Sequence, residues 1–165
     1  MICASFDIGK KNFSFYVEEF NCDSLPLTKI AQNKKYNQDG TPSDEFSGII
    51  SEFCLNGRKI LLENVDITNG CDPKAKLDPE TFHNMTDVLD EYQEIWDHCS
   101  VFIIEKQMQF GKQINPMAMK LGQHCYSYFA FKYGRFKEII EFPAYHKTQV
   151  LGAMKIQSSK KTKTG

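Results

Sequence analysis

The 165-residue sequence lacks any apolar run of the roughly 18–20 residues that a membrane span requires. Segment 1–7 has no basic residue ahead of its apolar stretch, as a secretory signal peptide would have, so we expect a strand there. The six cysteines are scattered and none forms a C-x-x-C pair, which argues against zinc and favours reduced, mostly buried thiols. These absences together predict an intracellular protein with no membrane partner.

Carboxylates are absent after Glu141, whereas five lysines follow it. Residues 1–99 hold 9 basic and 18 acidic side chains, and residues 100–165 hold 11 basic and 3 acidic side chains. This dipolar charge indicates that the C-terminal part contacts a polyanion, although a compact fold could also mix the two parts in space. The length and the hydrophobic fraction of 41% exclude a disordered chain, and we expect residues 1–165 to form one domain.

Hydrophobic periodicity predicts an α/β domain with one mixed sheet. The short connection between 1–8 and 13–20 favours an antiparallel hairpin. Predicted strands cover 1–8, 13–20, 58–67, 101–104 and 136–142, with a further strand near 25–31. Predicted helices cover 46–56, the span from Pro79 through Trp96, and 116–132, with a short helix from His146.

Two of the predicted apolar strands end on a carboxylate. Asp7 follows Cys3–Phe6, and Glu105 follows Ile103–Ile104. If the two strands are neighbours, the carboxylates can share a divalent metal, since Mg²⁺ prefers one or two carboxylates plus phosphates and waters. A pair of such metals about 4 Å apart would activate a water and stabilise the leaving oxygen in phosphodiester cleavage. The alternative is that each acid simply ends its strand at the solvent, paired with a nearby lysine.

The first acid lies in a D-x-G-x-x-N pattern that runs from Asp7 to Asn12. Gly9 would let the backbone turn tightly beside the acid. The pattern occurs in ribonuclease H-like nucleases and in the phosphate loop of actin-like ATPases and sugar kinases. The kinase interpretation needs a second glycine-rich phosphate loop and a much longer chain, so the pattern favours the nuclease interpretation.

Three patches together resemble the RuvC family of Holliday-junction resolvases. The first is Ser5–Asn12, the second pairs Ile104–Gln107 with Lys120–Gln123, and the third is His146–Gly152. The motifs as they stand in this sequence are more similar to those of the resolvases of poxviruses, other large DNA viruses and yeast mitochondria than to those of the bacterial enzymes. The resemblance implies a ribonuclease H-like mixed five-stranded sheet flanked by helices.

The resemblance also implies an activity and its residues. It implies a homodimeric endonuclease, serving DNA recombination and repair, that makes paired, symmetric nicks in four-way or branched DNA with Mg²⁺ or Mn²⁺. Asp7 and Glu105 would bind the metal, and Lys147 would steady the scissile phosphate or the attacking water. A viral member would act in the host-cell cytoplasm at sites of viral replication.

One departure from the family concerns its C-terminal pair of acids, usually D-x-x-D-A, which this sequence does not contain. The sequence is then either a domain without its C-terminal acidic helix, which would bind metal weakly, or a relative that binds junction or duplex DNA without cutting it. An RNA-directed nuclease on the same fold is a third alternative.

Several residues around these patches are candidates for contacts with DNA. Lysines would contact phosphates without reading sequence, and Phe110 could wedge between bases near a junction centre. The alternatives are solvated charge for each lysine and packing under a loop for Phe110. Glu63 and Asp66 match no motif and are expected at the surface or at a strand edge. The candidates for DNA contact are Lys106, Phe110, Lys112, Lys120 and Lys155.

Overall fold

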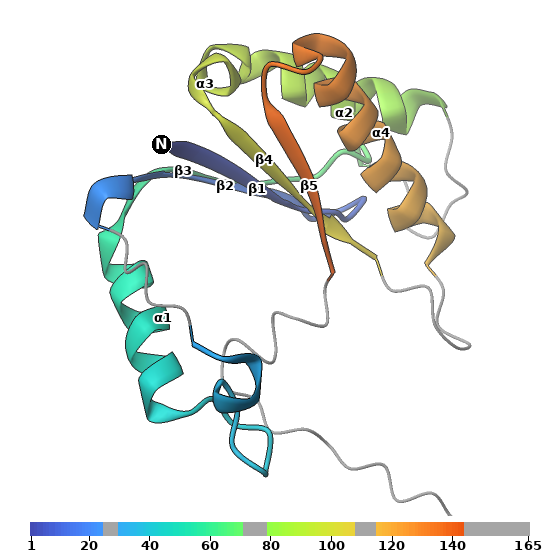
Figure 1. Ribbon diagram of the computed structural model, residues 1–165. Coiled ribbons are helices and arrows are strands. Elements are labelled where there is room, and N and C mark those ends of the chain that lie inside the picture. Colours follow the sequence, from blue (N-terminus) through green and yellow to red (C-terminus); the bar gives the residue numbers. More distant parts are fainter. Residues whose placement is uncertain (25–29, 71–78, 108–114, 144–165) are drawn as a thin grey trace, which may run out of the picture. The chain divides into compact units, whose positions relative to one another are not determined.

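The computed structural model describes residues 1–24, 30–70, 79–107 and 115–143 (Figure 1). The chain divides into two compact units. The first, called the sheet unit, comprises Met1–Leu25 and Asn56–Ala144, and the second comprises Pro26–Leu55 and Tyr145–Gly165. The predicted helix from His146 and most of the predicted strand near 25–31 lie outside the described residues. None of the described helices is long and apolar enough to cross a membrane.

The sheet unit is built on one mixed sheet, with strand order β3-β2-β1-β4-β5. β1 pairs antiparallel with β2, and β2 pairs antiparallel with β3. On the other side β1 pairs parallel with β4, which pairs parallel with β5. The five-stranded mixed sheet and the hairpin are therefore confirmed. The strands are β1 (Ile2–Asp7), β2 (Phe13–Phe20), β3 (Gly57–Val65), β4 (Val101–Lys106) and β5 (Glu138–Pro143).

The sheet carries α2, α3 and α4 on one side (Figure 1). Helix α4 begins at Pro116, where the Asn115 side chain accepts a hydrogen bond from the Ala118 N–H (3.2 Å), and Gly134 with φ +57° follows its end. The helices are α1 (Asp44–Asn56), α2 (Pro79–Glu91), α3 (Gln93–His98) and α4 (Pro116–Tyr133), and short 3₁₀ turns cover Cys22–Ser24 and Gln32–Lys34.

The prediction of one continuous helix from Pro79 through Trp96 is wrong, because the helix breaks at Tyr92 (φ −97°, ψ 17°). After the break, Trp96 lies in the core, fully buried. Its Nε1 donates a hydrogen bond to the Leu89 carbonyl oxygen (2.7 Å). Apolar periodicity cannot reveal the break, since both pieces bury their apolar side chains under the same sheet.

The core of the sheet unit is rich in aromatic side chains. Phe102 of β4 stacks on Phe129 of α4 with ring centroids 4.0 Å apart, and Trp96 meets Phe15 of β2 edge-on at 5.4 Å. Period-two alternation turns every second residue of the central strands toward the helices. Fully buried members of this cluster are Ala4, Phe13, Val17, Met85, Leu89, Trp96, Phe102, Leu121, Cys125 and Phe129.

The described part of the second unit is small. Tyr36 and Pro42 form an antiparallel bridge around a turn in which Asp39 accepts hydrogen bonds from the Thr41 N–H (2.9 Å) and hydroxyl (2.6 Å). The Tyr36 ring lies edge-on to Phe46 of α1, with centroids 5.4 Å apart. Helix α1, predicted over 46–56, is confirmed.

The turn between β1 and β2 depends on glycine, as its sequence predicted. A Cβ atom added to Gly9 would lie 2.8 Å from the Asn12 carbonyl oxygen, which is closer than real Cβ atoms approach. The obstacle is backbone rather than a flexible side chain, so the turn would have to shift.

We therefore expect Gly9→Ala to lower the stability of the sheet unit by about 1–3 kcal/mol through overpacking. Thermal unfolding followed by circular dichroism measures the change. Gly122→Ala is the matched control, because its Cβ would lie 3.9 Å from Ile8 Cγ1, an ordinary contact, and alanine favours the helix. A Gly9→Ala protein as stable as the wild type would contradict the steric argument.

The five cysteines in the described part of the chain are free thiols. Burial raises the pKa of the buried thiols, to about 11 for Cys99. The prediction of mostly buried thiols holds for Cys3, Cys99 and Cys125 and is wrong for Cys22 and Cys54, which are exposed because neither lies on a core-facing strand or helix surface.

Thiol labelling of the native protein should therefore be selective. Since the thiolate is the reactive form, we expect Cys22 and Cys54 to react with an aromatic disulfide reagent at least tenfold faster than Cys99 and Cys125. Peptide mapping by mass spectrometry after timed labelling identifies the sites. Equal labelling rates for the exposed and the buried thiols in the folded protein would contradict this prediction, because they would show that the core opens freely.

Candidate active site at the carboxyl ends of β1 and β4

The two predicted metal-binding carboxylates lie on neighbouring parallel strands. The register pairs Phe6 of β1 with Ile104 of β4, and the next residues along the two strands are Asp7 and Glu105. Adjacent strands lie about 4.8 Å apart, so the two carboxylates start from neighbouring backbone positions. The structure therefore brings the predicted pair together at one edge of the sheet.

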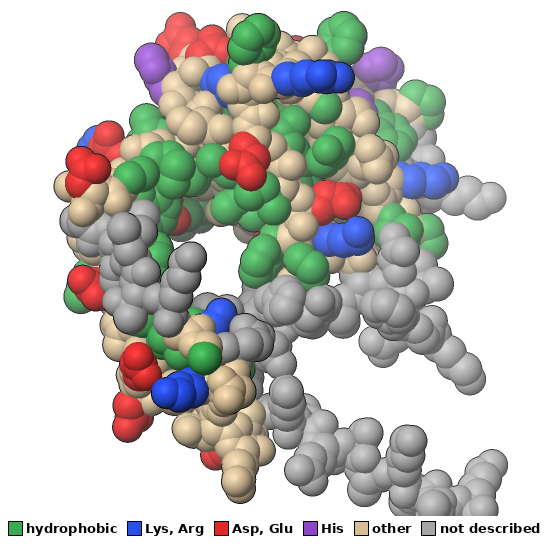
Figure 2. All heavy atoms as spheres, in the orientation of Figure 1, with side chains coloured by type: hydrophobic (Ala, Val, Ile, Leu, Met, Phe, Trp, Pro, Cys, Tyr) green, Lys and Arg blue, Asp and Glu red, His purple; other side chains and the backbone are tan. Residues whose placement is uncertain are grey.

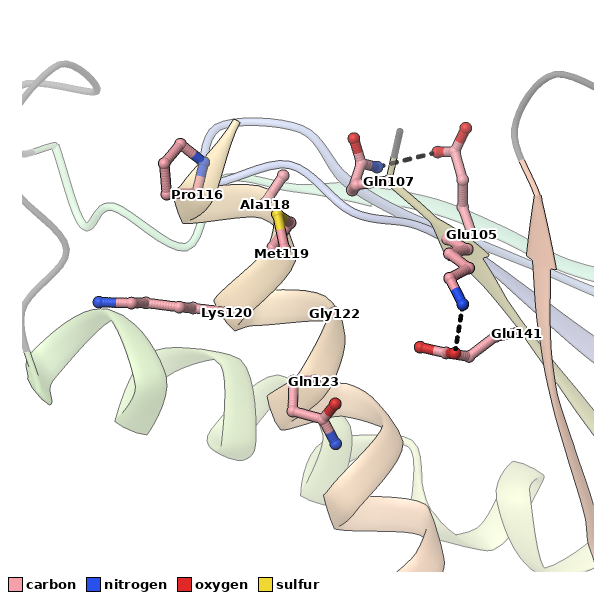
Figure 3. A pocket seen from close by; sticks show the side chains of 10 residues that line it. Glu105, Gln107, Pro116, Ala118, Met119, Lys120, Gly122, Gln123 and Glu141 are labelled. Carbon is pink, nitrogen blue, oxygen red and sulfur yellow. Dashed lines mark hydrogen bonds and ion pairs between the residues drawn. The ribbon is translucent and has the colours of Figure 1, made fainter. Parts of the chain in front are cut away.

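Both carboxylates lie on the face of the sheet opposite the helices. Phe6 and Ile104 are 3% and 1% exposed in the helix-covered core, and the following residue of each strand points the other way. Asp7 is exposed and Glu105 is half-buried. Gln107 Nε2 donates a hydrogen bond to Glu105 Oε2 (3.4 Å), and Figure 3 shows the Glu105 side chain directed away from Glu141. Residues described here contain no cluster of three or more His, Cys, Asp or Glu side chains placed to hold a metal.

A pocket of about 520 Å³ lies between the carboxyl ends of β4 and β5 and the first half of α4 (Figure 3). It joins the two halves of the second sequence patch, Ile104–Gln107 and Lys120–Gln123, which the fold brings to opposite walls. Leu121 of this patch is instead fully buried in the core. The lining residues are Glu105, Lys106, Gln107, Pro116, Ala118, Met119, Lys120, Gly122, Gln123 and Glu141.

Lys106, a predicted DNA contact, forms an ion pair with Glu141 of β5 (Nζ–Oε2 3.4 Å). Lys120, the other described candidate, is exposed on α4. Sequence reasoning assigned no role to Glu141 or to Gln107. Gln107 follows Glu105 by two residues, a local signal, whereas the partnership of Glu141 with Lys106 depends on the pairing of β4 with β5.

The remaining predicted site residues lie outside the described residues, and their roles stay predictions. This group contains the predicted catalytic lysine and three predicted DNA contacts. They are Phe110, Lys112, Lys147 and Lys155.

Glu63 and Asp66, which were expected outside the site, lie on and just after the edge strand β3. Asp66 accepts hydrogen bonds from the Thr68 N–H (2.8 Å) and hydroxyl (2.6 Å). These bonds, and then the charges of Lys11 and Lys10, lower the pKa of Asp66. Lys10, which directly follows Gly9, is only 7% exposed, and sequence reasoning missed its burial.

Helix α4 is held against α2 by polar contacts as well as by the core. His124 Nε2 lies 2.9 Å from Thr86 Oγ1, and the His124 ring meets Phe82 edge-on at 5.1 Å. Asp90 of α2 accepts hydrogen bonds from Tyr128 and Lys132 of α4. These contacts keep the first half of α4, with Lys120, beside the ends of β4 and β5.

Acidic and basic side chains are intermixed on the visible face of the sheet unit (Figure 2). The sheet explains this, because β1, β2 and β3 come from the acidic part of the sequence and lie beside β4 and β5 from the basic part. In the described sheet, strands from the two parts of the sequence therefore lie side by side.

Comparison with known proteins gives viral relatives. No protein-family model matches the chain. Uncharacterized protein 170L of Invertebrate iridescent virus 6 is 31% identical over 165 residues, which cover 92% of this chain and 58% of that protein. Uncharacterized protein 97L of Invertebrate iridescent virus 3 is 26% identical over 163 residues, covering 91% of this chain and 74% of that protein. The chain thus spans little more than half the length of the first relative.

Solved structures with a similar backbone include two resolvases. The fowlpox virus Holliday junction resolvase has a TM-score of 0.44 and 17% identity, covering 87% of this chain and 61% of that one. RuvC of Thermus thermophilus has a TM-score of 0.48 and 13% identity, covering 90% of this chain and 68% of that one. The strand order and the strand directions define the architecture of the sheet, and they do not depend on these TM-scores and identities. The described strands form the five-stranded mixed sheet expected from the sequence, in the order β3-β2-β1-β4-β5.

Burial lowers the pKa of His124 below its ordinary value of about 6.5. The folded protein therefore binds fewer protons at this site than the unfolded chain. The stability that a neutral His124 provides is complete above pH 6.5 and is lost as the pH falls through and below that value. We expect His124→Gln, which keeps a polar partner for Thr86, to flatten the decline in the free energy of unfolding between about pH 7 and 5. Urea unfolding at several pH values tests this, and parallel curves for the two proteins would contradict it.

Proposed function

We propose that this chain is a divalent-metal-dependent DNA endonuclease that acts on four-way junctions. The observation that carries the proposal is the parallel pairing of β1 with β4, which puts Asp7 and Glu105 side by side at their carboxyl ends. These are the two acids to which the sequence resemblance assigns metal binding. Their position on the face away from the aromatic core leaves them accessible to an ion and a substrate.

The donor set fits Mg²⁺ or Mn²⁺, since both ions prefer oxygen ligands and two carboxylates leave coordination positions for water and phosphate. Asp7 and Glu105 would hold the ion, which when bound supplies charge stabilisation at the phosphodiester and a more acidic water. Gln107 orients the Glu105 carboxylate through its hydrogen bond, as outer residues of metal sites do.

Basic residues around the pocket would hold the DNA backbone. Lys106 and Lys120 line the pocket beside Glu105, and contacts from such side chains to phosphates carry no sequence information. Recognition of a junction requires shape rather than sequence, so this is sufficient. We further propose that Lys147 steadies the scissile phosphate, with Phe110, Lys112 and Lys155 as additional contacts, and that two copies of the chain act together. A symmetric dimer presents two identical sites to the two equivalent strands of a junction.

Cleavage of a synthetic four-way junction with Mg²⁺ tests the proposal. We expect Asp7→Asn and Glu105→Gln each to reduce nicking by at least a hundredfold, because each removes a charged metal ligand, while junction binding measured by gel shift remains within a few-fold. Titration calorimetry with Mn²⁺ alone should show weaker metal binding by both variants.

Glu63→Gln provides the matched control, because it neutralises a half-buried glutamate on the edge strand β3, two strands from β1 and on the helix-covered face of the sheet, opposite to Asp7 and Glu105. It should cut and bind like the wild type. Undiminished cleavage by Asp7→Asn or Glu105→Gln would overturn the assignment. Junction binding by the wild type without any metal-dependent cleavage would instead be the behaviour expected of a DNA-binding module or of a domain without its C-terminal acidic helix, and preference for an RNA–DNA hybrid would change the substrate class.

A further inference from the structure

The ion pair between Lys106 and Glu141 occupies one end of the candidate pocket. Lys106 Nζ lies 3.4 Å from Glu141 Oε2, and the side chains are 49% and 42% exposed. Figure 3 shows the Glu141 carboxylate in this pair. Both residues line the pocket together with Glu105 and Lys120.

Glu141 lies apart from the proposed metal ligands. The register pairs Ile104 of β4 with Glu141 of β5, so Glu141 is on the same face of the sheet as the buried Ile104. Asp7 and Glu105 belong to the opposite face. Lys106 follows Ile104 by two residues and returns to the face of Glu141, which is why these two side chains meet.

The pair contributes little to the stability of the fold, because exposed ion pairs in water are weak and screened by salt. The position of the ion pair beside the pocket matters more for the binding of phosphate than for the stability of the fold. A lysine beside the pocket attracts phosphate, and a carboxylate held against it cancels that attraction and repels a phosphate at the same place.

We propose that Glu141 competes with DNA phosphate for Lys106 and thereby lowers the affinity of this edge for any DNA backbone. The inference rests on the proposed function, since it requires DNA to reach the pocket. While the ion pair holds, Lys106 is not available to a phosphate, so the pair weakens binding to a junction and to a linear duplex alike. Glu141 is in this sense a residue that lowers affinity for the DNA backbone without touching the metal.

The variant Glu141→Gln tests the competition by freeing Lys106. Affinity for a four-way junction, and for a linear duplex of equal length, is measured by fluorescence anisotropy between about 50 and 200 mM salt. We expect both DNAs to bind about two- to fivefold more tightly at the lowest salt concentration. The slope of log affinity against log salt should become steeper by about one, because one more phosphate contact releases counterions.

Two controls separate competition from a general change in net charge. Glu138→Gln removes the same charge from the same strand, but at the amino end of β5, where its register partner is Val101. It should change affinity less than Glu141→Gln. In a Lys106→Met background, Glu141→Gln should raise affinity no more than Glu138→Gln does, since the contact that it releases is gone and only the change in net charge remains. Thermal unfolding checks that all variants remain folded.

The outcomes separate this inference from the proposed function. Equal gains from Glu138→Gln and Glu141→Gln, or a Glu141→Gln gain that stays as large in the Lys106→Met background as in the wild type, would overturn the competition while leaving the nuclease proposal intact. A wild-type protein that binds junction DNA while Glu141→Gln binds it no better would do the same. If neither protein binds a four-way junction at any salt concentration, the proposed function falls and the inference with it.

Discussion

The parallel pairing of β1 with β4 is the constraint on which the candidate site depends. The two strands are far apart in the sequence, yet Phe6 lies opposite Ile104 in the sheet. A slip of one residue in either strand would turn Asp7 or Glu105 into the helix-covered core, where an unpaired carboxylate is costly. The burial of two apolar side chains thus determines the register, and the register places the two carboxylates together on the opposite face.

The aromatic core positions helix α4, which forms one wall of the pocket. Phe129 stacks on Phe102 and holds α4 across the sheet, while His124 meets Thr86 of α2 and limits how the helix can move. The first half of α4 consequently borders the ends of β4 and β5, with Lys120 on the pocket wall. The two halves of the second sequence patch, which are separated along the chain, become one surface because Ile104 and Leu121 of the patch are themselves buried in the core.

Charge in this protein acts locally rather than as a uniform field. The C-terminal part of the sequence is strongly basic, but the sheet inserts its strands beside strands from the acidic part. Within the basic part itself, Lys106 forms an ion pair with Glu141 of the adjacent strand. Pairing of a lysine with a neighbouring carboxylate is a local property, and net charge by itself does not report it.

The strands, the helix that starts at Pro116, and the two strand-end acids Asp7 and Glu105 could all be predicted from the sequence. Alternation of apolar and polar residues, the position of a proline and the end of an apolar run are local properties that depend only on neighbouring residues. The break at Tyr92 and the partnership of Glu141 with Lys106 could not be predicted in this way. Each depends on contacts between segments that only the folded chain brings together: the packing of Trp96 under the sheet and the register of β5 against β4. The sequence by itself determined which side chains end the strands, and the tertiary structure decided which of them meet, because pairing distant strands is settled by burying a shared core.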